Sequence, residues 1–408
     1  MGVPDGLLAG VRVLDLTRMV AGPLAAQVLG DLGATVFKVE RPGTGDDTRG
    51  MGPFLHDAQG RQTTDSPYFF AYNRGKRSVT VDISTPAGAR IVRTLAASCD
   101  VLIENYKVGA LKKYGLSYED LREAAPRLVY CSITAFGMDG PYAPRPGYDS
   151  ITQGMAGLMS TNGPAPELAG SEPLRTSVPI TDVVTGLYAV NAALAALHRR
   201  AQTGRGEHVD VSLFDASVGV NGPLAVEYLL NGRVPQRNGN ANPLSAPSES
   251  FDCSDGKVMV AIGNNSQFDS LCEGLGLPRL REQQRFATGW ERARHRPELH
   301  ALLEARTRTY TVTGLIEHLN RFNVPVGGIL SLDQVFADPQ VQHRGLAVFV
   351  PHRHAPQVPV LRSPIRVGGE PLPAGSPPAL GEHTDAVLAE ELGFSAQQIA
   401  ELRESGAI

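Results

Sequence analysis

Hydrophobic positions in the first third of the chain alternate between two spacings. Short continuous apolar runs, typical of buried β-strands, occupy residues 11–16, 35–40, 77–83, 100–105 and 127–134. The segments between them carry apolar residues at helical spacing, at 22–34, 85–98 and 117–126. Strands that alternate with helices in this way predict parallel pairing with right-handed crossovers. We therefore expect an α/β fold with a doubly wound, Rossmann-like sheet.

Residues typical of helix starts support these boundaries. Thr85 precedes Pro86, and Ser117 precedes an acidic turn. Ser395 stands before an apolar-periodic segment that ends at Gly406. Hydroxyl side chains at these positions accept hydrogen bonds from the free N–H groups of the first helical turn, and a glycine ends a helix readily.

The rest of the chain divides by composition. Helical spacing dominates from 150 to 232, with one strand at 207–214, and a polar stretch rich in Gly, Pro, Asn and Ser follows. We expect four regions: the first part of a large domain at 1–230, a linker at 231–250, a small domain at 251–330, and a return segment at 331–408. The last region is expected to begin with one helix at 332–346 and to contain two strand-like runs.

Charge and cysteine usage exclude several classes of protein. The net charge is −4, from 38 Lys+Arg and 42 Asp+Glu, without long basic or acidic runs. This pattern argues against a nucleic-acid binder or a polybasic membrane anchor. Four scattered cysteines form no CxxC motif, so neither a disulfide framework nor a zinc site is expected. The N-terminus has no basic region of a signal peptide, and the apolar helix near "LYAVNAALAALHRR" is expected to be a buried one, shorter than a bilayer span. We expect a cytoplasmic protein.

Two local patterns resemble ligand sites but lack essential parts. The first strand–helix–strand unit ends in Glu40, yet its turn reads "TRMVAGPLA" without the glycines of a dinucleotide-binding fingerprint. We interpret Glu40 as a solvated strand end beside Lys38 and Arg41. The stretch "HRH" at 352–354 offers two histidines without a third ligand nearby in sequence, and we interpret it as a solvated strand edge with no metal.

Nine collinear segments resemble the family III CoA-transferases, the CaiB/BaiF family that includes formyl-CoA transferase and the α-methylacyl-CoA racemases. They are "LDLTRMVAGP", "LGDLGATVFKVERPGTGDDTRG", "NRGKRSVTVD", "DVLIENYKVGALKKYGL", "ITAFGMDGP", "TDVVTGLYA", "TGRGEHVDVSLFDA", "VPVGGILSLDQVFADPQVQHRGL" and "LGEHTDAVL". The resemblance implies a Rossmann-like large domain formed by both chain ends, with a smaller inserted α+β domain. It also implies an interlocked homodimer.

Asp182 is the main candidate for catalysis. From the residues alone, Asp182 or Thr181 is expected to cap a helix that starts at Val183. The resemblance instead implies that Asp182 is the nucleophile, and the two interpretations are compatible because a helix N-terminus stabilises a carboxylate. The implied reaction passes through an aspartyl-CoA thioester, with coenzyme A as substrate and no permanently bound cofactor.

The resemblance also implies binding residues. The CoA candidates are Arg41, Asn105, Tyr106, Lys113 and a basic cluster of Arg74, Lys76 and Arg77. Several segments are closest to the succinyl-CoA–glutarate branch, with itaconate-type enzymes similar, and a dicarboxylate needs a cation for its second carboxylate. The candidates for contact with the acyl substrate are Tyr148, Arg175, Arg49 and Arg145.

Two alternatives to transfer remain open. The racemases of the family carry a His-Asp pair where this chain has Tyr148, and tyrosine has a reference pKa of about 10, too high for an efficient base at neutral pH. A non-catalytic CoA-ester-binding protein is the other alternative, although it would not need Asp182. Val20 and Thr134 stand where formyl-CoA transferase has glutamine and lysine, and a run of four glycines is missing, which argues against formate and oxalate as substrates.

Overall fold

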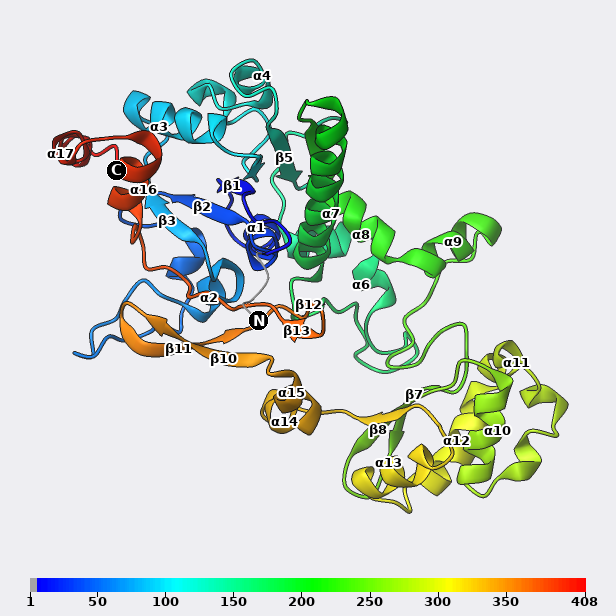
Figure 1. Cartoon of the computed structure of the whole chain (residues 1–408). Helices are drawn as coiled ribbons and strands as arrows, with labels where there is room; N and C mark the ends of the chain where they lie inside the picture. Colours follow the sequence, from blue (N-terminus) through cyan, green and yellow to red (C-terminus); the bar gives the residue numbers. More distant parts are fainter. Residues whose placement is uncertain (1–5) are drawn as a thin grey trace. The chain divides into compact units, whose positions relative to one another are not determined.

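In the computed structural model, which describes residues 6–408, the chain folds into two compact units (Figure 1). The larger unit contains residues up to 158, 176–229 and 339–408, and the smaller unit contains 159–175 and 230–338. These units differ from the expected regions in 331–338 and in two longer segments, 159–175 and 231–250, all of which belong to the smaller unit. Hydrogen bonds join the two segments: Gly239 N donates to Gly163 O (3.0 Å), and Arg237 Nε donates to Pro164 O (3.1 Å).

A six-stranded parallel sheet forms the centre of the larger unit, in the order β3-β2-β1-β4-β5-β6. Its strands are β1 (Arg12–Asp15), β2 (Thr35–Glu40), β3 (Arg77–Thr80), β4 (Val101–Glu104), β5 (Val129–Thr134) and β6 (His208–Ser212). The five strands expected in the first third of the chain are all present. The strand order reverses between β1 and β4, and open sheets of this kind bind ligands at the carboxyl ends of strands beside such a reversal.

Helices cover both faces of this sheet (Figure 1). Buried side chains of α1 (Ala21–Asp31) and α7 (Ile180–Thr203) join one hydrophobic core with β1, β4 and β5. The other core combines α3 (Pro86–Ala97), α16 (Thr384–Leu392) and α17 (Ala396–Glu404) with the opposite sheet face. β4 and β5 are buried along their whole length, which explains their continuous apolar runs.

The predicted helix starts are confirmed. The side chain of Thr85 accepts a hydrogen bond from Gly88 N at the start of α3. Ser117 and Ser395 form capping boxes at α4 (Tyr118–Leu121) and α17. Short local patterns are therefore sufficient to locate these boundaries.

The C-terminal segment completes the larger unit. The helix expected at 332–346 is interrupted, because Pro339 begins a new helix: α14 (Leu332–Ala337), which belongs to the smaller unit, is followed by α15 (Pro339–Arg344), which belongs to the larger one. β10 (Ala347–His352) and β11 (Ala355–Leu361) form an antiparallel hairpin, and β12 (Arg366–Val367) pairs with β13 (Glu370–Pro371). The hairpin packs against α2 (Pro67–Asn73) through Phe69, Phe70 and three valines. The remaining helices of this unit are α5 (Asp149–Met155), α8 (Leu213–Val220) and α9 (Gly222–Asn231), with α6 (Leu158–Thr161) at its boundary.

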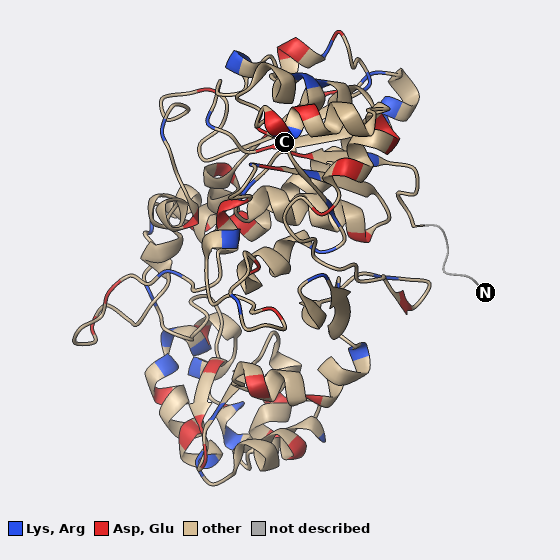
Figure 2. Cartoon of the chain, turned by 90° about the vertical axis from the view of Figure 1, so that its left-hand side faces the viewer, with Lys and Arg blue, Asp and Glu red and all other residues tan. Residues whose placement is uncertain are grey.

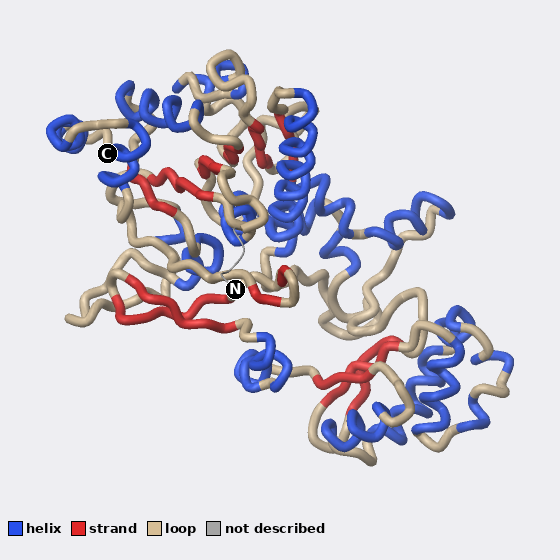
Figure 3. Tube along the Cα trace, in the orientation of Figure 1, coloured by secondary structure: helices blue, strands red, loops and turns tan. Residues whose placement is uncertain are grey.

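The smaller unit contains a short sheet and several helices (Figure 3), and it has its own hydrophobic core. Its three-stranded antiparallel sheet contains β7 (Ser248–Asp252), β8 (Lys257–Ala261) and β9 (Val326–Gly328). Three helices pack in the same core: α10 (Asn265–Gly274), α12 (Arg296–Thr307) and α13 (Val312–Asn320). The short helix α11 (Gly289–Arg294) contacts it through Arg292, whose guanidinium lies 4.2 Å from the ring centre of Phe268. Charged residues of both signs are interspersed over the helices of each unit (Figure 2).

α7 is longer than expected. It has 24 residues and is the one helix of the described chain that is long and apolar enough to span a bilayer by length and composition. Its small residues Ala189, Ala193 and Ala196 are buried against the sheet, whereas Leu187 and Tyr188 are exposed. The helix is therefore a core helix of the larger unit with an additional uncovered apolar face.

Candidate active site

Asp149 fixes the start of α7. The N-cap residue of this helix is Pro179, which provides no side-chain hydrogen bond. Instead, the carboxylate of Asp149, the first residue of α5, accepts hydrogen bonds from Thr181 N (2.9 Å) and Thr181 Oγ1 (2.7 Å). The expectation that Asp182 or Thr181 caps this helix was wrong, because a carboxylate from α5 occupies that position. The Asp182 carboxyl group therefore does not cap the helix and can interact with a ligand.

Asp182 lies in the first turn of α7 in an environment that disfavours its charge. Burial, and then the nearby negative charge of Asp149, raise the pKa of Asp182 to about 7. Within residues 6–408, no hydrogen-bond donor contacts the Asp182 carboxyl. A carboxylate without hydrogen bonds, poorly solvated and close to neutral in pKa, has the character of a nucleophile or a proton-transfer group.

A cavity of about 220 Å³ opens beside Asp182 in the larger unit. Residues that follow β1, β4 and β5 form much of its wall, as the strand-order reversal predicts. Its lining residues are Arg18, Met19, Ala21, Asp47, Asn105, Tyr106, Lys107, Val108, Ile133, Thr134, Ala135, Ala143, Arg145, Pro146, Gly147, Tyr148, Asp182 and Leu213.

Hydrogen bonds hold the loop after β1 in a strained shape at this cavity. Asn105 Nδ2 donates to Arg18 O (2.7 Å), and Asn105 Oδ1 accepts from Arg18 N (2.9 Å). Met19 has a φ of 70°, in the left-handed region that few residues other than glycine adopt. Its N–H donates to Asp46 Oδ1 (3.2 Å), and Asp46 is itself paired with the buried Lys38 (2.9 Å). Backbone strain maintained by buried partners is typical of functional sites.

The N-termini of α1 and α7 meet closely behind this loop. Gly186, one turn after Asp182, is buried against α1, and a Cβ atom there would lie 2.6 Å from Ala21 O. The N-cap residue of α1, Val20, provides no side-chain hydrogen bond, and Ala21 lines the cavity. The uncapped N-terminus of α1 therefore places its positive partial charge beside the cavity that contains Asp182.

A second cavity, of about 280 Å³, shares Arg18 and Tyr106 with the first. Arg41, one of the predicted CoA-binding residues, is exposed and lines this cavity. Tyr114 lines it as well. Lys113 is not among the lining residues, but its Nζ lies 4.5 Å from the ring centre of Tyr114. The structure thus brings Arg41 and Tyr106 together and puts Lys113 at the edge of the same cavity.

The basic cluster of Arg74, Lys76 and Arg77 requires correction. Lys76 is 3% exposed, and its Nζ donates to Asp15, Asn73 and the Pro23 carbonyl, at 2.8 Å in each case. Arg74 is also buried and pairs with Asp31. Neither cation lines the Asp182 cavity or the second cavity, and each already neutralises a buried carboxylate. Arg77 pairs with Glu390 (2.8 Å) on α16.

Arg49 requires the same correction. Its guanidinium is buried, with Nε and Nη2 donating to Glu40 (2.7 and 2.9 Å) and Nη1 donating to Asp65 (3.1 Å). It also lies over the ring of Phe69, 3.5 Å from the ring centre. The interpretation of Glu40 as a solvated strand end was wrong, because Glu40 is 3% exposed and is the main partner of Arg49. Arg49 is therefore an internal ion-pair residue and does not contact the first cavity.

Three candidates for substrate contact are exposed but lie in different places. Tyr148 and Arg145 line the first cavity with Asp182. The Arg145 guanidinium lies over Tyr142 (4.5 Å) and Phe136 (5.5 Å), and no ion pair within residues 6–408 involves it. Arg175 belongs to the smaller unit and does not line this cavity.

Three residues of the site had not been identified from the sequence. Arg18 and Lys107 line the first cavity as cations, and Asp149 holds α7. Asp149 directly follows Tyr148 in the segment compared with the racemases, and Arg18 lies within "LDLTRMVAGP". Their positions in these family motifs could have identified both residues as site candidates. Arg18 also pairs with Asp47 (2.9 Å), another lining residue.

Comparisons with known proteins agree with this geometry. Residues 8–384 match the sequence profile described as CoA-transferase family III. The chain is 43% identical over 385 residues to a succinate–glutarate CoA-transferase from Agrobacterium fabrum, covering 94% of this chain and 95% of that protein. It is 39% identical over 402 residues to the human succinyl-CoA:glutarate CoA-transferase, covering 98% and 90% of the two chains. A solved CaiB/BaiF family protein from Brucella suis superposes with a TM-score of 0.81 at 45% identity, covering 95% of this chain and 99% of that one.

Proposed function

Because the chain belongs to CoA-transferase family III, we propose that it moves CoA from succinyl-CoA to a second dicarboxylate, with Asp182 as the covalent nucleophile. The observation that supports this proposal most is the position of Asp182, in a cavity, in the first turn of α7 and without a hydrogen-bond donor among the described residues. Glutarate is the preferred acceptor, because relatives of 43% and 39% identity are named for it. Itaconate is the next acid to test.

The proposed reaction has four transfers. The Asp182 carboxylate attacks the thioester carbonyl of succinyl-CoA, which gives a mixed anhydride and free CoA thiolate. The thiolate attacks the aspartyl carbonyl, so that succinate leaves and an aspartyl-CoA thioester remains. The acceptor carboxylate then attacks this thioester and releases the thiolate again. Finally, the thiolate attacks the acceptor's acyl carbon, which frees the new acyl-CoA and the Asp182 carboxylate.

Each attack places negative charge on a carbonyl oxygen. The uncapped first turn of α1 lies beside the cavity through Ala21, and its free N–H groups are suitable donors to such an oxygen. The closeness of Gly186 to Ala21 O fixes α1 against the helix that carries Asp182. We assign the oxyanion site to the first turn of α1 for this reason.

The two cavities suit the two ends of CoA. Arg41 in the second cavity is assigned to the adenine and 3′-phosphate end, and Lys113 to a phosphate at its edge. Tyr106 lines both cavities and Asn105 lines the first, so the pantetheine arm would pass them on its way to Asp182. Coenzyme A is then a substrate, and no permanently bound cofactor is required.

Arg145 is assigned to the second carboxylate of the acyl group. It lines the Asp182 cavity, it has no acidic partner in the described chain, and two aromatic rings restrict its guanidinium. A restrained guanidinium binds a carboxylate through two parallel hydrogen bonds at a low entropic cost. Tyr148, which is 63% exposed, would contact the same substrate.

A homodimer is part of the proposal, in the interlocked form that the family resemblance implies. α9 has no buried residue, and its Val226, Tyr228 and Leu229 are 53%, 50% and 79% exposed. Leu187 and Tyr188 on α7 are exposed as well. An apolar surface of this kind suits a second copy of the chain, and light scattering after gel filtration would measure the assembly. A cytoplasmic location stays a prediction from the sequence.

The racemase alternative has less support. It needs acid and base groups on both sides of the substrate's α-carbon, and the relevant position is Tyr148. None of the described residues that line the Asp182 cavity is a histidine. Loss of deuterium from the α-position of a 2-methylacyl-CoA would support this alternative.

A labelling experiment tests the proposal directly. The protein is incubated with succinyl-CoA, trapped with hydroxylamine or borohydride, digested and analysed by mass spectrometry. We expect modification of the peptide that contains Asp182, and we expect glutarate to remove the label before trapping. Turnover without any modification of Asp182 would contradict the covalent route, while labelling that only other acids discharge would retain the route and reject glutarate.

A further inference from the structure

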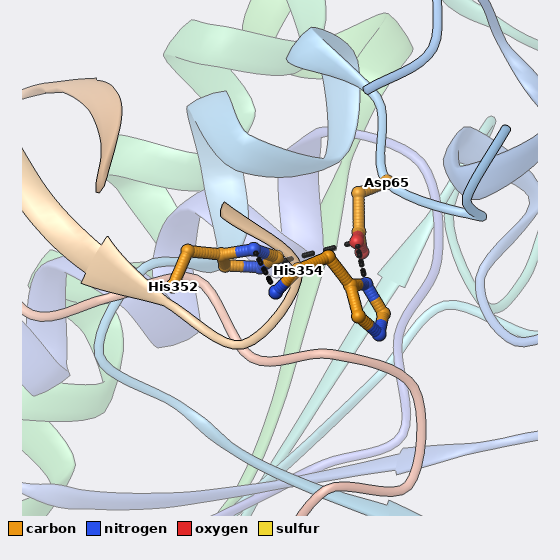
Figure 4. Close-up of side chains that lie close together, drawn as sticks. All are labelled: Asp65, His352 and His354. Carbon is orange, nitrogen blue, oxygen red and sulfur yellow. Dashed lines mark hydrogen bonds and ion pairs between the residues drawn. The ribbon is translucent and has the colours of Figure 1, made fainter. Parts of the chain in front are cut away.

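The residues at 352–354 do not form the solvated strand edge that the sequence predicts. His352 ends β10, and its side chain is fully buried against the ring of Phe70, 5.2 Å away between ring centres. Asp65, which is also fully buried, precedes the N-cap residue of α2 and lies beside both histidines (Figure 4). His354 is one third exposed, at 33%. A ligand set from two distant parts of the sequence is thus brought together by the packing of the hairpin on α2.

The three side chains have the spacing of a metal site. Asp65 Oδ2 lies 2.6 Å from His354 Nδ1 and 4.0 Å from His352 Nε2, and the three ligand atoms all lie within 4.8 Å of one another. Ligands of tetrahedral zinc, with bonds of about 2.0–2.1 Å, are separated by about 3.3 Å. The two distances from Asp65 lie on either side of that value. Small side-chain rotations would therefore complete the geometry.

An unpartnered nitrogen faces this site. His352 Nε2 is buried without a hydrogen-bond partner among the described residues. A buried polar atom without a partner costs stability, and a bound ion would remove that cost.

The charges around Asp65 are not balanced, and a bound cation would balance them. Arg49 is a single positive charge between two buried carboxylates, Glu40 and Asp65. It uses Asp65 Oδ1, which leaves Oδ2 directed at the histidines. Arg49 compensates only one of these two negative charges, and a divalent ion bound to two nitrogens and one oxygen would supply the missing positive charge.

We propose that Asp65, His352 and His354 bind a divalent transition-metal ion of the zinc class, with water at the fourth position on the exposed side of His354. The ion would join the β10–β11 hairpin to the start of α2 and so stabilise the larger unit. None of the three residues lines the cavity of Asp182 or the second cavity, so the site is separate from the proposed transfer chemistry.

Binding requires two local rearrangements. The hydrogen bond of 2.6 Å between His354 Nδ1 and Asp65 Oδ2 must break, because the ion would bind both atoms. His352 Nδ1 accepts a hydrogen bond of 3.2 Å from His354 N, whereas a ring that binds metal through Nε2 carries its proton on Nδ1. The turn at Arg353 must therefore open this contact when the ion binds.

Metal titration of the untagged protein tests the site. After treatment with EDTA and removal of the chelator, Co²⁺ is added while visible absorption is recorded, and Zn²⁺ binding is measured by calorimetry. We expect one Co²⁺ per chain with the intense visible bands of tetrahedral cobalt, displacement by Zn²⁺, and a higher melting temperature with Zn²⁺. Absence of stoichiometric binding would overturn the proposal.

Two variants and a control make the result specific. His354→Gln should weaken Zn²⁺ binding at least about tenfold, whereas His198→Gln, which changes an exposed histidine on α7, should leave it unchanged. His354→Cys retains a metal ligand and should add a sulfur-to-cobalt charge-transfer band. Melting temperatures in EDTA show whether each variant is folded. Equal binding by wild type and folded His354→Gln, or a folded His354→Cys without the new band, would contradict the assignment.

Discussion

The carboxyl groups of Asp149 and Asp182 are electrostatically coupled but have different roles. Asp149 is buried and accepts two hydrogen bonds from Thr181, whereas Asp182 accepts none from the described residues. The charge of Asp149 adds to burial in raising the pKa of Asp182. One carboxylate therefore positions the helix and adjusts the ionisation of the other.

Asp182→Asn should abolish CoA transfer, with a loss of at least about 10⁴-fold in kcat, because the amide cannot form the anhydride. Activity with succinyl-CoA and glutarate and the labelling assay both measure this loss. Asp215→Asn is the matched control, since Asp215 occupies the first turn of α8 at the same position relative to its N-cap and does not line the cavity. Full activity of Asp182→Asn would reject the nucleophile.

The same variant, Asp182→Asn, should increase the stability of the folded protein by an amount that depends on pH. The folded-state pKa of Asp182, about 7, lies above its ordinary value of 3.8, so the folded state holds more protons than the unfolded state between these two pH values. The contribution of Asp182 to stability is thus present below pH 3.8 and lost as pH rises through 7. Asp182→Asn should melt at a higher temperature than wild type at pH 8, with little difference near pH 4. No gain at pH 8 would contradict the raised pKa.

Asp149→Asn should move the acidic limb of the kcat/KM profile for succinyl-CoA to lower pH. Removing the like charge lowers the pKa of Asp182, so more of the carboxylate is ionised at a given pH. Weaker capping of α7 should cost about 1 kcal/mol of stability. Thr181→Val is the control, because it removes one hydrogen bond to Asp149 but leaves the charge, and its acidic limb should stay at the wild-type pH.

Arg145→Gln should reduce kcat/KM for glutarate about 10- to 100-fold, the range for loss of a charge-assisted hydrogen bond of about 1.5–3 kcal/mol. A monocarboxylate acceptor of similar length should be affected much less. Arg175→Gln, outside the cavity, is the comparison. Equal losses for the mono- and dicarboxylate would assign Arg145 a structural role.

Gly186→Ala should destabilise the larger unit by about 1–3 kcal/mol and lower kcat, because the new methyl group would displace Ala21 and the first turn of α1. Gly219→Ala in α8 is the matched control, since its Cβ would meet no atom within 4 Å. That variant should be neutral or more stable by up to about 1 kcal/mol. The two melting temperatures, measured together with kcat, distinguish a shift of α1 from the general effect of alanine in a helix.

Local sequence patterns were sufficient to predict the strands of the sheet, but they did not predict the partners of the charged residues. The five expected strands and the caps at Thr85, Ser117 and Ser395 depend on residues close in sequence, and the structure confirms them. Lys76 pairs with Asp15, which is 61 residues away, and His354 pairs with Asp65 at a separation of 289 residues. A periodicity over a few residues contains no information on such partners. The positions of Arg41 and Tyr148 at cavities followed from the family resemblance, and physical pattern alone would not have selected them.

The outer edge of β3 has a consequence for biosynthesis. Thr80 N donates to Thr384 Oγ1 (3.0 Å), His383 N donates to Ser78 O (2.9 Å), and Asp82 N donates to Ala407 O (2.9 Å). These partners leave the ribosome hundreds of residues after the strand itself. Until then a nascent chain presents an unpaired strand edge, which is a template for aggregation. Premature termination shortly before His383 should therefore yield insoluble protein, even though the whole parallel sheet and Asp182 have already been synthesised.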